Sequence, residues 1–126
     1  MRTTKLPRVL AAVAAVILLL TAALHARGYA NVSKAVSVAG MPPFLRQTSP
    51  GLWLFFAWHL LALAAVACWA GLRGVQSARP LLVFCTAMVI VDTAFAYTLG
   101  GVFVGTLMLA AAAVLLLGAT LRWPAS

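Results

Sequence analysis

Three ionisable residues lie within or at the end of long apolar stretches of this 126-residue chain: His25, His59 and Asp92. Ionisable side chains inside a membrane-spanning helix are costly, usually face the interior of the helix bundle, and are candidates for functional sites. Asp92 is the single acidic residue of the sequence, and His25 and His59 are its two histidines. We therefore expect any polar intramembrane site of this chain to use these three residues.

Three kinds of chemistry suit this set of residues. In a structural interpretation, His59 and Asp92 form a hydrogen-bonded pair that holds two helices together, with His25 at the interface. In a cofactor interpretation, His25 and His59 ligate haem b, or His25, His59 and Asp92 form a transition-metal site with two imidazoles and one carboxylate. In a third interpretation, Asp92 titrates beside His59 in a proton-coupled small transporter that acts as an oligomer.

Other residues are predicted to line this site or to pack helices around it. Trp58, Tyr97 and Tyr29 are candidates for its lining, and an aromatic belt at the membrane interfaces is the alternative explanation for them. Gly101-Val-Phe-Val-Gly105 is a GxxxG motif, which allows another helix to approach closely in a membrane. The sequence contains no nucleophile elbow, P-loop, dinucleotide-binding or zinc-protease motif, so no catalytic residue is assigned.

The composition identifies the environment in which these residues act. Hydrophobic residues make up 65% of the chain and charged residues only 8%, whereas a soluble domain carries about 25% charged residues. This excludes an ordinary soluble domain, and the single acid excludes enzymes that use paired carboxylates within one chain. The net charge of +8 comes from scattered Lys and Arg residues, which favours membrane-edge positions over nucleic-acid binding.

Four apolar stretches approach the length of about 20 residues that a helix needs to cross a bilayer. They cover residues 8–27, 52–72, 80–99 and 102–122. The six prolines are expected outside these helices or in their first turns, because proline lacks an N–H and clashes with the preceding helical turn. We therefore predict an all-α membrane protein: a single domain, residues 1–126, that forms a four-transmembrane-helix bundle.

A count along the predicted helices places two of the ionisable residues at the same depth. His59 lies seven residues from Leu52, and Asp92 lies seven residues before Leu99, so each is roughly 10 Å from the same end of the bundle. The two antiparallel helices are joined by a short connection and are expected to be neighbours. His59 and Asp92 are thus predicted to lie level with each other in the outer leaflet, with His25 about one turn shallower.

Residues 28–51 form the one long connection, between the first two spans. We expect a short helix that lies in the membrane interface, ends near Gly40 and is followed by a turn at Pro42-Pro43. The basic residues before the first span and the Thr21-Ala22-Ala23 segment also suit a cleavable signal peptide, and cleavage would leave three spans.

The distribution of basic residues predicts the orientation of the bundle. With four spans, one side of the membrane holds three basic residues: Arg27, Lys34 and Arg46. The other side holds six: Arg2, Lys5, Arg8, Arg73, Arg79 and Arg122. The positive-inside rule then places both termini in the cytoplasm and the connection 28–51 outside.

Two short patterns carry a resemblance to known proteins. Leu24-His25 followed by Gly28, together with Trp58-His59 in the second span, resembles a pattern in small uncharacterised bacterial four-helix membrane proteins, and the overall shape is similar to DoxX-like proteins. The resemblance implies a multi-pass protein of the bacterial inner membrane and no particular activity. Small multidrug transporters share the size and the number of spans, but they depend on a glutamate in the first helix, and this sequence contains no Glu.

Together these observations predict a small polytopic integral membrane protein with a polar site in the outer leaflet. The leading interpretation is a non-enzymatic subunit or a small binding protein. Its expected partners are the lipid bilayer and either other membrane-protein subunits or further copies of the same chain, with no nucleic acid.

Overall fold

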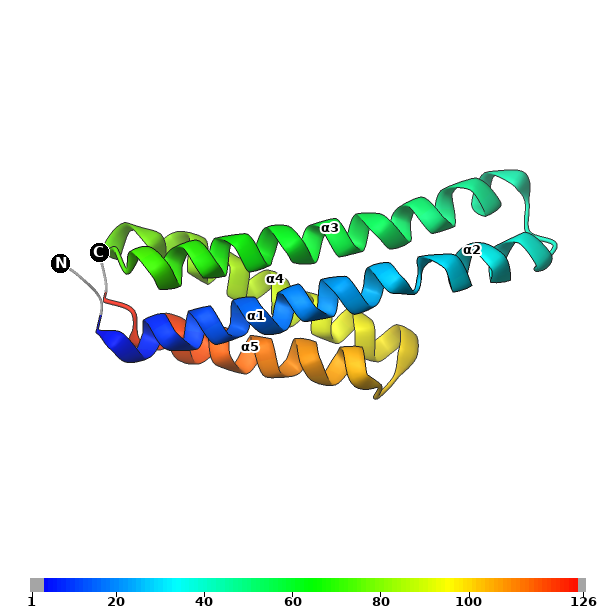
Figure 1. Ribbon diagram of the computed structural model, residues 1–126. Coiled ribbons are helices and arrows are strands. Elements are labelled where there is room, and N and C mark those ends of the chain that lie inside the picture. Colours follow the sequence, from blue (N-terminus) through cyan, green and yellow to red (C-terminus); the bar gives the residue numbers. More distant parts are fainter. Residues whose placement is uncertain (1–3, 125–126) are drawn as a thin grey trace.

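The structure, a computed structural model, describes residues 4–124 and is helical without strands over that range. The elements in chain order are α1 (Lys5–Arg27), α2 (Tyr29–Val38), α3 (Pro43–Arg73), the short 3-10 helix η1 (Gln76–Ala78), α4 (Arg79–Gly100) and α5 (Val104–Arg122). Four helical segments are long and apolar enough to cross a membrane: α1 with α2, α3, α4 with η1, and α5. The prediction of four helices that are long and apolar enough to form a membrane bundle is therefore confirmed, and α1 begins at the end of the bundle where α5 ends (Figure 1).

Glycine and proline set the ends of the helices near the connections. α3 ends where Gly74 takes a left-handed conformation with φ of 58°, and the Gly74 N–H bonds to the carbonyl of Ala70 at 2.9 Å. Pro80 lies in the first turn of α4, where its missing N–H leaves no helical bond unmade. α4 ends before Gly101, whose φ of 68° allows the sharp reversal into α5.

The four long helices form a ring in the order α1, α3, α4, α5. α1 packs extensively against α3 and against α5, whereas the α3–α4 side has the least contact of the four (Figure 1). The ring therefore has one weak side, between α3 and α4.

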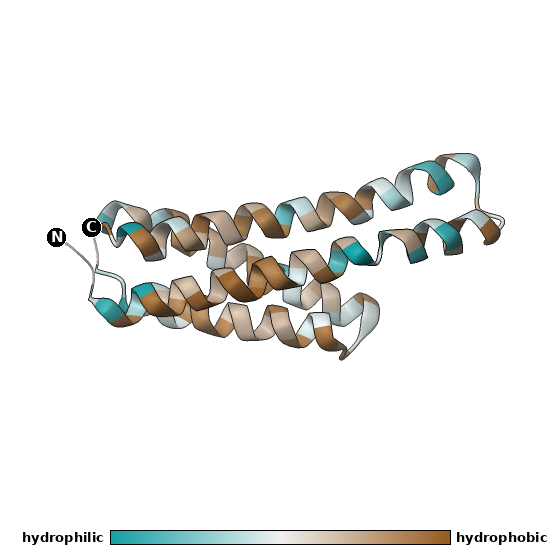
Figure 2. Ribbon diagram, viewed as in Figure 1, coloured by the Kyte–Doolittle hydropathy of each residue, from teal (hydrophilic) through white to brown (hydrophobic). Residues whose placement is uncertain are grey.

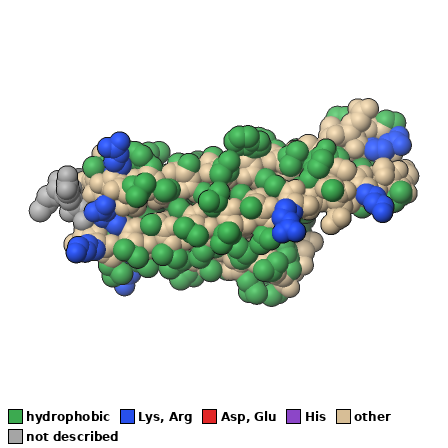
Figure 3. Space-filling view, in the orientation of Figure 1, with side chains coloured by type: hydrophobic (Ala, Val, Ile, Leu, Met, Phe, Trp, Pro, Cys, Tyr) green, Lys and Arg blue, Asp and Glu red, His purple; other side chains and the backbone are tan. Residues whose placement is uncertain are grey.

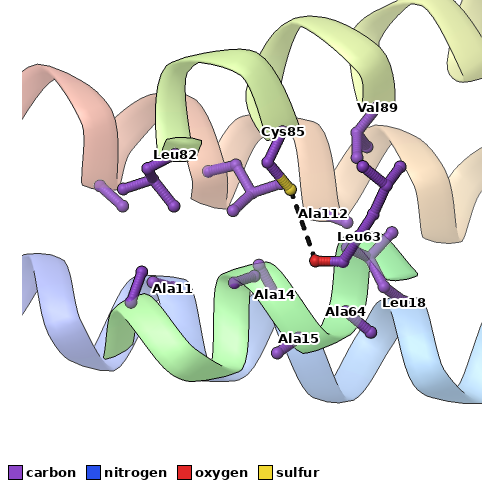
Figure 4. Packing of buried hydrophobic residues seen from close by; sticks show 14 of the residues in the cluster. Ala11, Ala14, Ala15, Leu18, Leu63, Ala64, Leu82, Cys85, Val89 and Ala112 are labelled. Carbon is purple, nitrogen blue, oxygen red and sulfur yellow. Dashed lines mark hydrogen bonds between the residues drawn. The ribbon is translucent and has the colours of Figure 1, made fainter. Parts of the chain in front are cut away.

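Small side chains allow the helices of the core to approach closely. Figure 4 shows buried alanines of α1, α3 and α5 in one cluster with Leu63 of α3 and with Leu82 and Val89 of α4. Gly71 is part of this close packing, because a Cβ atom there would lie 2.9 Å from the carbonyl oxygen of Arg8. The fully buried alanines are Ala11, Ala14, Ala67, Ala70, Ala78, Ala112 and Ala119.

The outer surface of the bundle is apolar, and its polar residues gather toward the ends. Figure 2 shows brown, hydrophobic helices with teal segments mainly near the termini and in α2 and the start of α3. Figure 3 shows the Lys and Arg side chains toward the two ends of the elongated molecule, with green hydrophobic side chains between them. This distribution fits a bundle whose middle is surrounded by lipid.

The connection between the first two spans is more helical than predicted. The expected short helix is present as α2, followed by a turn in which Gly40 has φ of 61°. α3, however, begins at Pro43, nine residues before the predicted start of the second span at Leu52. Pro50 lies inside α3, contrary to the expectation for all six prolines. The proline removes one helical hydrogen bond to Arg46, in an exposed stretch where water can bond to that carbonyl.

These residues form a helical hairpin, residues 29–51, that we call the outer hairpin. α2 continues approximately along the direction of α1 and packs beside the start of α3 (Figure 1). At 1.5 Å per residue, the 19 residues of α5 span about 28 Å, close to the thickness of a hydrocarbon core, whereas the 31 residues of α3 span about 46 Å. The outer hairpin accounts for this extra length and extends past the α4–α5 turn (Figure 1).

Side-chain hydrogen bonds connect the helices at the opposite end of the bundle, where α1 begins and α5 ends. The Arg8 guanidinium donates to the carbonyl oxygens of Gly71 at 2.9 Å and Leu72 at 2.8 Å, in the last turn of α3. The indole N–H of Trp123 donates to the carbonyl oxygen of Val75 at 3.2 Å, and Trp123 is buried. Trp123 is therefore a packing residue at this end, and not part of a lipid-facing aromatic belt.

Candidate functional site

His59 of α3 and Asp92 of α4 form the polar centre of the bundle. The imidazole Nε2 lies 2.9 Å from the carboxylate Oδ2, which is hydrogen-bond distance. The Asp92 side chain is buried, with 8% of its surface exposed, and the His59 side chain is 24% exposed. The equal depth that the residue count predicted for these two residues is thus present in the structure.

The helix periodicity explains why the carboxyl group of Asp92 faces inward. The buried residues of α4 are Leu82, the adjacent pair Cys85 and Thr86, Val89 and Asp92, and this spacing of three to four residues per turn places them along one face. Asp92 therefore continues the stripe that faces the rest of the bundle, where it meets His59. About two turns before Asp92 on the same stripe, the thiol of Cys85 lies 3.5 Å from the carbonyl oxygen of Leu63 of α3. The pair thus bridges the side of the ring where α3 and α4 share the least contact.

His25 lies near this pair but does not join it. Its ring stacks on the indole of Trp53, with centroids 3.9 Å apart and planes 13° from parallel, and it meets the Phe56 ring edge-on at 5.0 Å. The indole N–H of Trp53 also donates to the backbone oxygen of His25 at 2.6 Å. His25 is thereby held at the junction of α1 and α3, while its buried Nε2 atom makes no hydrogen bond with the described residues.

Aromatic residues that sequence reasoning did not assign to the site connect the two histidines. The Phe56 ring lies 5.0 Å from His25 and 6.0 Å from His59, so it packs on both. Trp53, Phe56 and His59 follow one another at steps of three on α3, and this spacing puts them on adjacent parts of one helix face. That spacing was the available signal, but Trp53 lay too close to the predicted start of the span to be considered.

The arrangement corrects the proposed metal site. Among residues 4–124, no group of three His, Cys, Asp or Glu side chains could hold a metal ion, so the structure does not assemble His25, His59 and Asp92 into one ligand set. The physical reason is that the His25 ring packs against Trp53 and Phe56, while His59 bonds to Asp92. Haem b ligation by the two histidines stays a prediction, and ligation through Nε2 of His59 would require that atom to leave Asp92.

The three aromatic residues predicted to line the site lie on the surface. Trp58 is 69% exposed, Tyr97 is 59% exposed and Tyr29 is 40% exposed. Trp58 lines an open apolar groove of about 270 Å³ between α1 and α3. These side chains are therefore exposed residues of α3, α4 and α2, and within the described range no hydrogen bond joins them to the His59–Asp92 pair.

The GxxxG motif forms a turn and does not pack two helices of this chain. Gly101 precedes α5, which begins two residues later than predicted, and a Cβ atom on it would meet no other atom within 4 Å. The ring of Phe103 fills the space beside Gly100 and Gly105, where an added Cβ atom would lie 2.8 Å and 2.6 Å from it. The two glycines that matter for packing here are thus Gly100 and Gly105, and they hold an aromatic ring.

Comparison of this chain with protein-family models, curated proteins and solved structures finds no match. The function therefore has to be inferred from the residues and their arrangement.

Proposed function

We propose that this multi-pass membrane protein is non-enzymatic and acts as a subunit of a larger assembly or as a small binding protein. The observation that carries the proposal is that the single carboxylate of the chain, Asp92, forms a hydrogen bond between two helices. Asp92 is buried and hydrogen-bonded to His59 across the weakest side of the ring, so it links two helices. The outer hairpin supports the subunit role, because it offers a surface beyond the bundle, with Val38 at 79% and Phe44 at 72% exposure near its tip.

The mass of the particle tests this proposal. We would extract the tagged chain from its own membranes in lipid nanodiscs and measure its mass by light scattering. A stoichiometric partner that rebinds after separate purification supports the subunit role, and Phe44→Ser in the outer hairpin should weaken that rebinding. Leu121→Ser is the matched control, because Leu121 is 73% exposed and lies at the C-terminal end of α5, far from the outer hairpin. A chain that occurs alone and binds no small molecule contradicts the proposal.

A proton-coupled transporter is the second candidate, because a His–Asp hydrogen bond inside a span is suited to hold and release a proton. Uptake into proteoliposomes that follows an imposed pH gradient, and that Asp92→Asn abolishes, would establish this candidate. An absorption spectrum and metal analysis of the same purified protein, beside a His59→Ala variant, test the haem alternative. A Soret band that disappears in the variant would replace both proposals with a cofactor protein.

We also propose that the protein lies in the bacterial inner membrane with both termini in the cytoplasm. The excess of basic residues at the end that carries the termini supports this orientation. Single cysteines at the exposed positions Ser37 and Ser77 test it, in a chain whose native cysteines are replaced by Ala. Ser37→Cys should react with an impermeant maleimide in intact spheroplasts, and Ser77→Cys only after lysis. The reverse result would invert the topology.

A further inference from the structure

The groove between α1 and α3 opens on the outer surface of the bundle and is lined by four alanines, three leucines and Trp58. It follows α1 from Leu19 to Ala26, which is about 10 Å along the helix, and its floor on α3 includes Ala57. The indole of Trp58 forms part of its wall. A groove of this length and apolar lining matches part of an aliphatic chain, which needs apolar contact and no hydrogen bond.

A cation stands at the end of this groove. Arg27 follows Ala23 by four residues on α1, so it lies one turn further along the same helix face. Arg27 is exposed, and within residues 4–124 it has no hydrogen-bond or ion-pair partner. The chain contains a single acidic side chain, Asp92, and that carboxylate bonds to His59. No acidic side chain of residues 4–124 is therefore left to pair with Arg27, and an anionic head group at this level would meet an unopposed positive charge.

From this juxtaposition we infer that the α1–α3 groove is a binding site for one anionic phospholipid. An acyl chain lies along the alanines of α1 against Trp58, and the phosphate group pairs with Arg27 at the level where the helices leave the hydrocarbon. The depth is consistent with this, because Trp53, which bonds to the backbone of His25, lies at the same level close to the end of the span. This site is separate from the His59–Asp92 pair and does not rest on the function proposed above.

Native mass spectrometry of the detergent-purified full chain tests the site. The probes are dioleoylphosphatidylglycerol and dioleoylphosphatidylcholine, which have the same acyl chains and differ in head-group charge. We expect one tightly held phosphatidylglycerol molecule per chain. A basic residue near an anionic membrane surface contributes about 1 kcal/mol, so Arg27→Gln should weaken phosphatidylglycerol binding about fivefold. It should weaken phosphatidylcholine binding less, because the choline ammonium group offsets the charge of that lipid's phosphate.

Matched variants separate the groove from general effects of charge and bulk. Arg46→Gln removes an exposed cation of the outer hairpin and should leave binding unchanged. Ala26→Phe fills the groove and should weaken the binding of both lipids, whereas Ala30→Phe adds the same bulk at an exposed position outside it. Thermal unfolding and helix content show whether each variant is folded, and Arg27→Gln keeps the test open if Ala26→Phe does not fold.

Three results would overturn the inference. The first is equal binding of the two lipids by the unaltered chain. The second is an equal loss of phosphatidylglycerol binding in Arg27→Gln and Arg46→Gln, which would mean a diffuse charge effect. The third is a change in the number of subunits in Ala26→Phe with lipid binding intact, which would mean that the groove holds a second copy of the chain.

Discussion

Removing one partner of the His59–Asp92 hydrogen bond should destabilise the bundle more than removing both. In His59→Leu, the Asp92 carboxyl group stays buried but loses the partner that lies 2.9 Å away. A hydrogen bond between membrane helices is worth about 0.6–2 kcal/mol, and a buried group left without a partner adds about 1–3 kcal/mol. We therefore expect His59→Leu to lower the free energy of unfolding by about 2–4 kcal/mol.

The variants Asp92→Leu and His59→Leu/Asp92→Leu complete a double-mutant cycle, and each should lose less stability than His59→Leu. Asp92→Leu leaves an unpaired imidazole, but the His59 side chain is 24% exposed and has more freedom to reorient, so we expect a loss of about 1–2 kcal/mol. The double variant replaces both polar groups with apolar ones, and such replacements are close to neutral or stabilising when the packing is kept. We expect the double variant to lie within about 1 kcal/mol of the unaltered chain.

Reversible unfolding in mixed detergent micelles, monitored by steric trapping, measures these free energies. Cys68→Ala is the control, because Cys68 is an exposed α3 residue away from the pair. The reasoning is refuted if His59→Leu costs no more than Cys68→Ala. It is also refuted if the double variant loses as much stability as the two single variants added together, because the two residues would then act independently.

Three further predictions concern packing, helix capping and thiol access. Gly71→Ala should lower the free energy of unfolding by about 1–3 kcal/mol, because the new Cβ atom would press on backbone atoms of α1. Gly51→Ala, which meets no atom within 4 Å, should be neutral or raise it by up to about 1 kcal/mol. Arg8→Lys should lower it by about 1 kcal/mol in the same assay, because an ammonium group cannot reproduce the two guanidinium bonds to the end of α3. In the folded protein, a small apolar maleimide should modify Cys68 and leave the buried Cys85 unmodified until unfolding, as measured by mass spectrometry.

Each of these predictions has a clear opposing result. Equal stability of the two Gly→Ala variants would contradict the close α1–α3 packing. An Arg8→Lys variant as stable as the unaltered chain would mean that one bond suffices to cap α3. Modification of Cys85 at the rate of Cys68 would mean that the α3–α4 side opens readily in the folded protein.

The sequence predicted the parts of the fold that depend on helix geometry and on the transfer of apolar side chains from water into the bilayer. The four spans and the His59–Asp92 pair follow from hydropathy and from a constant rise per residue in two antiparallel helices. The start of α3 did not follow, because hydropathy falls before Leu52 and Pro50 is a strong sign of a helix end. Packing against α2 keeps this stretch helical, and contact between distant segments is not visible in local composition.

The placement of His25 also depended on such contacts. Its place near the end of the first span was predicted, but its stacking on Trp53 depends on how α1 and α3 rotate against each other. The same holds for the GxxxG motif, whose glycines are used by Phe103, a residue inside the motif itself. In each case the residue types were identified, and the partner was set by tertiary packing.

The α4–α5 turn, with Phe103 held against Gly100 and Gly105, has a consequence for how the chain enters the membrane. An aspartate near the centre of a helix opposes its insertion by about 2.5–3.5 kcal/mol, so α4 is the least favourable span to insert alone. α5 has no ionisable residue before Arg122, and the tight turn joins it directly to α4. We therefore expect the two helices to enter the membrane as one unit, in which the apolar α5 offsets the cost of inserting Asp92 of α4.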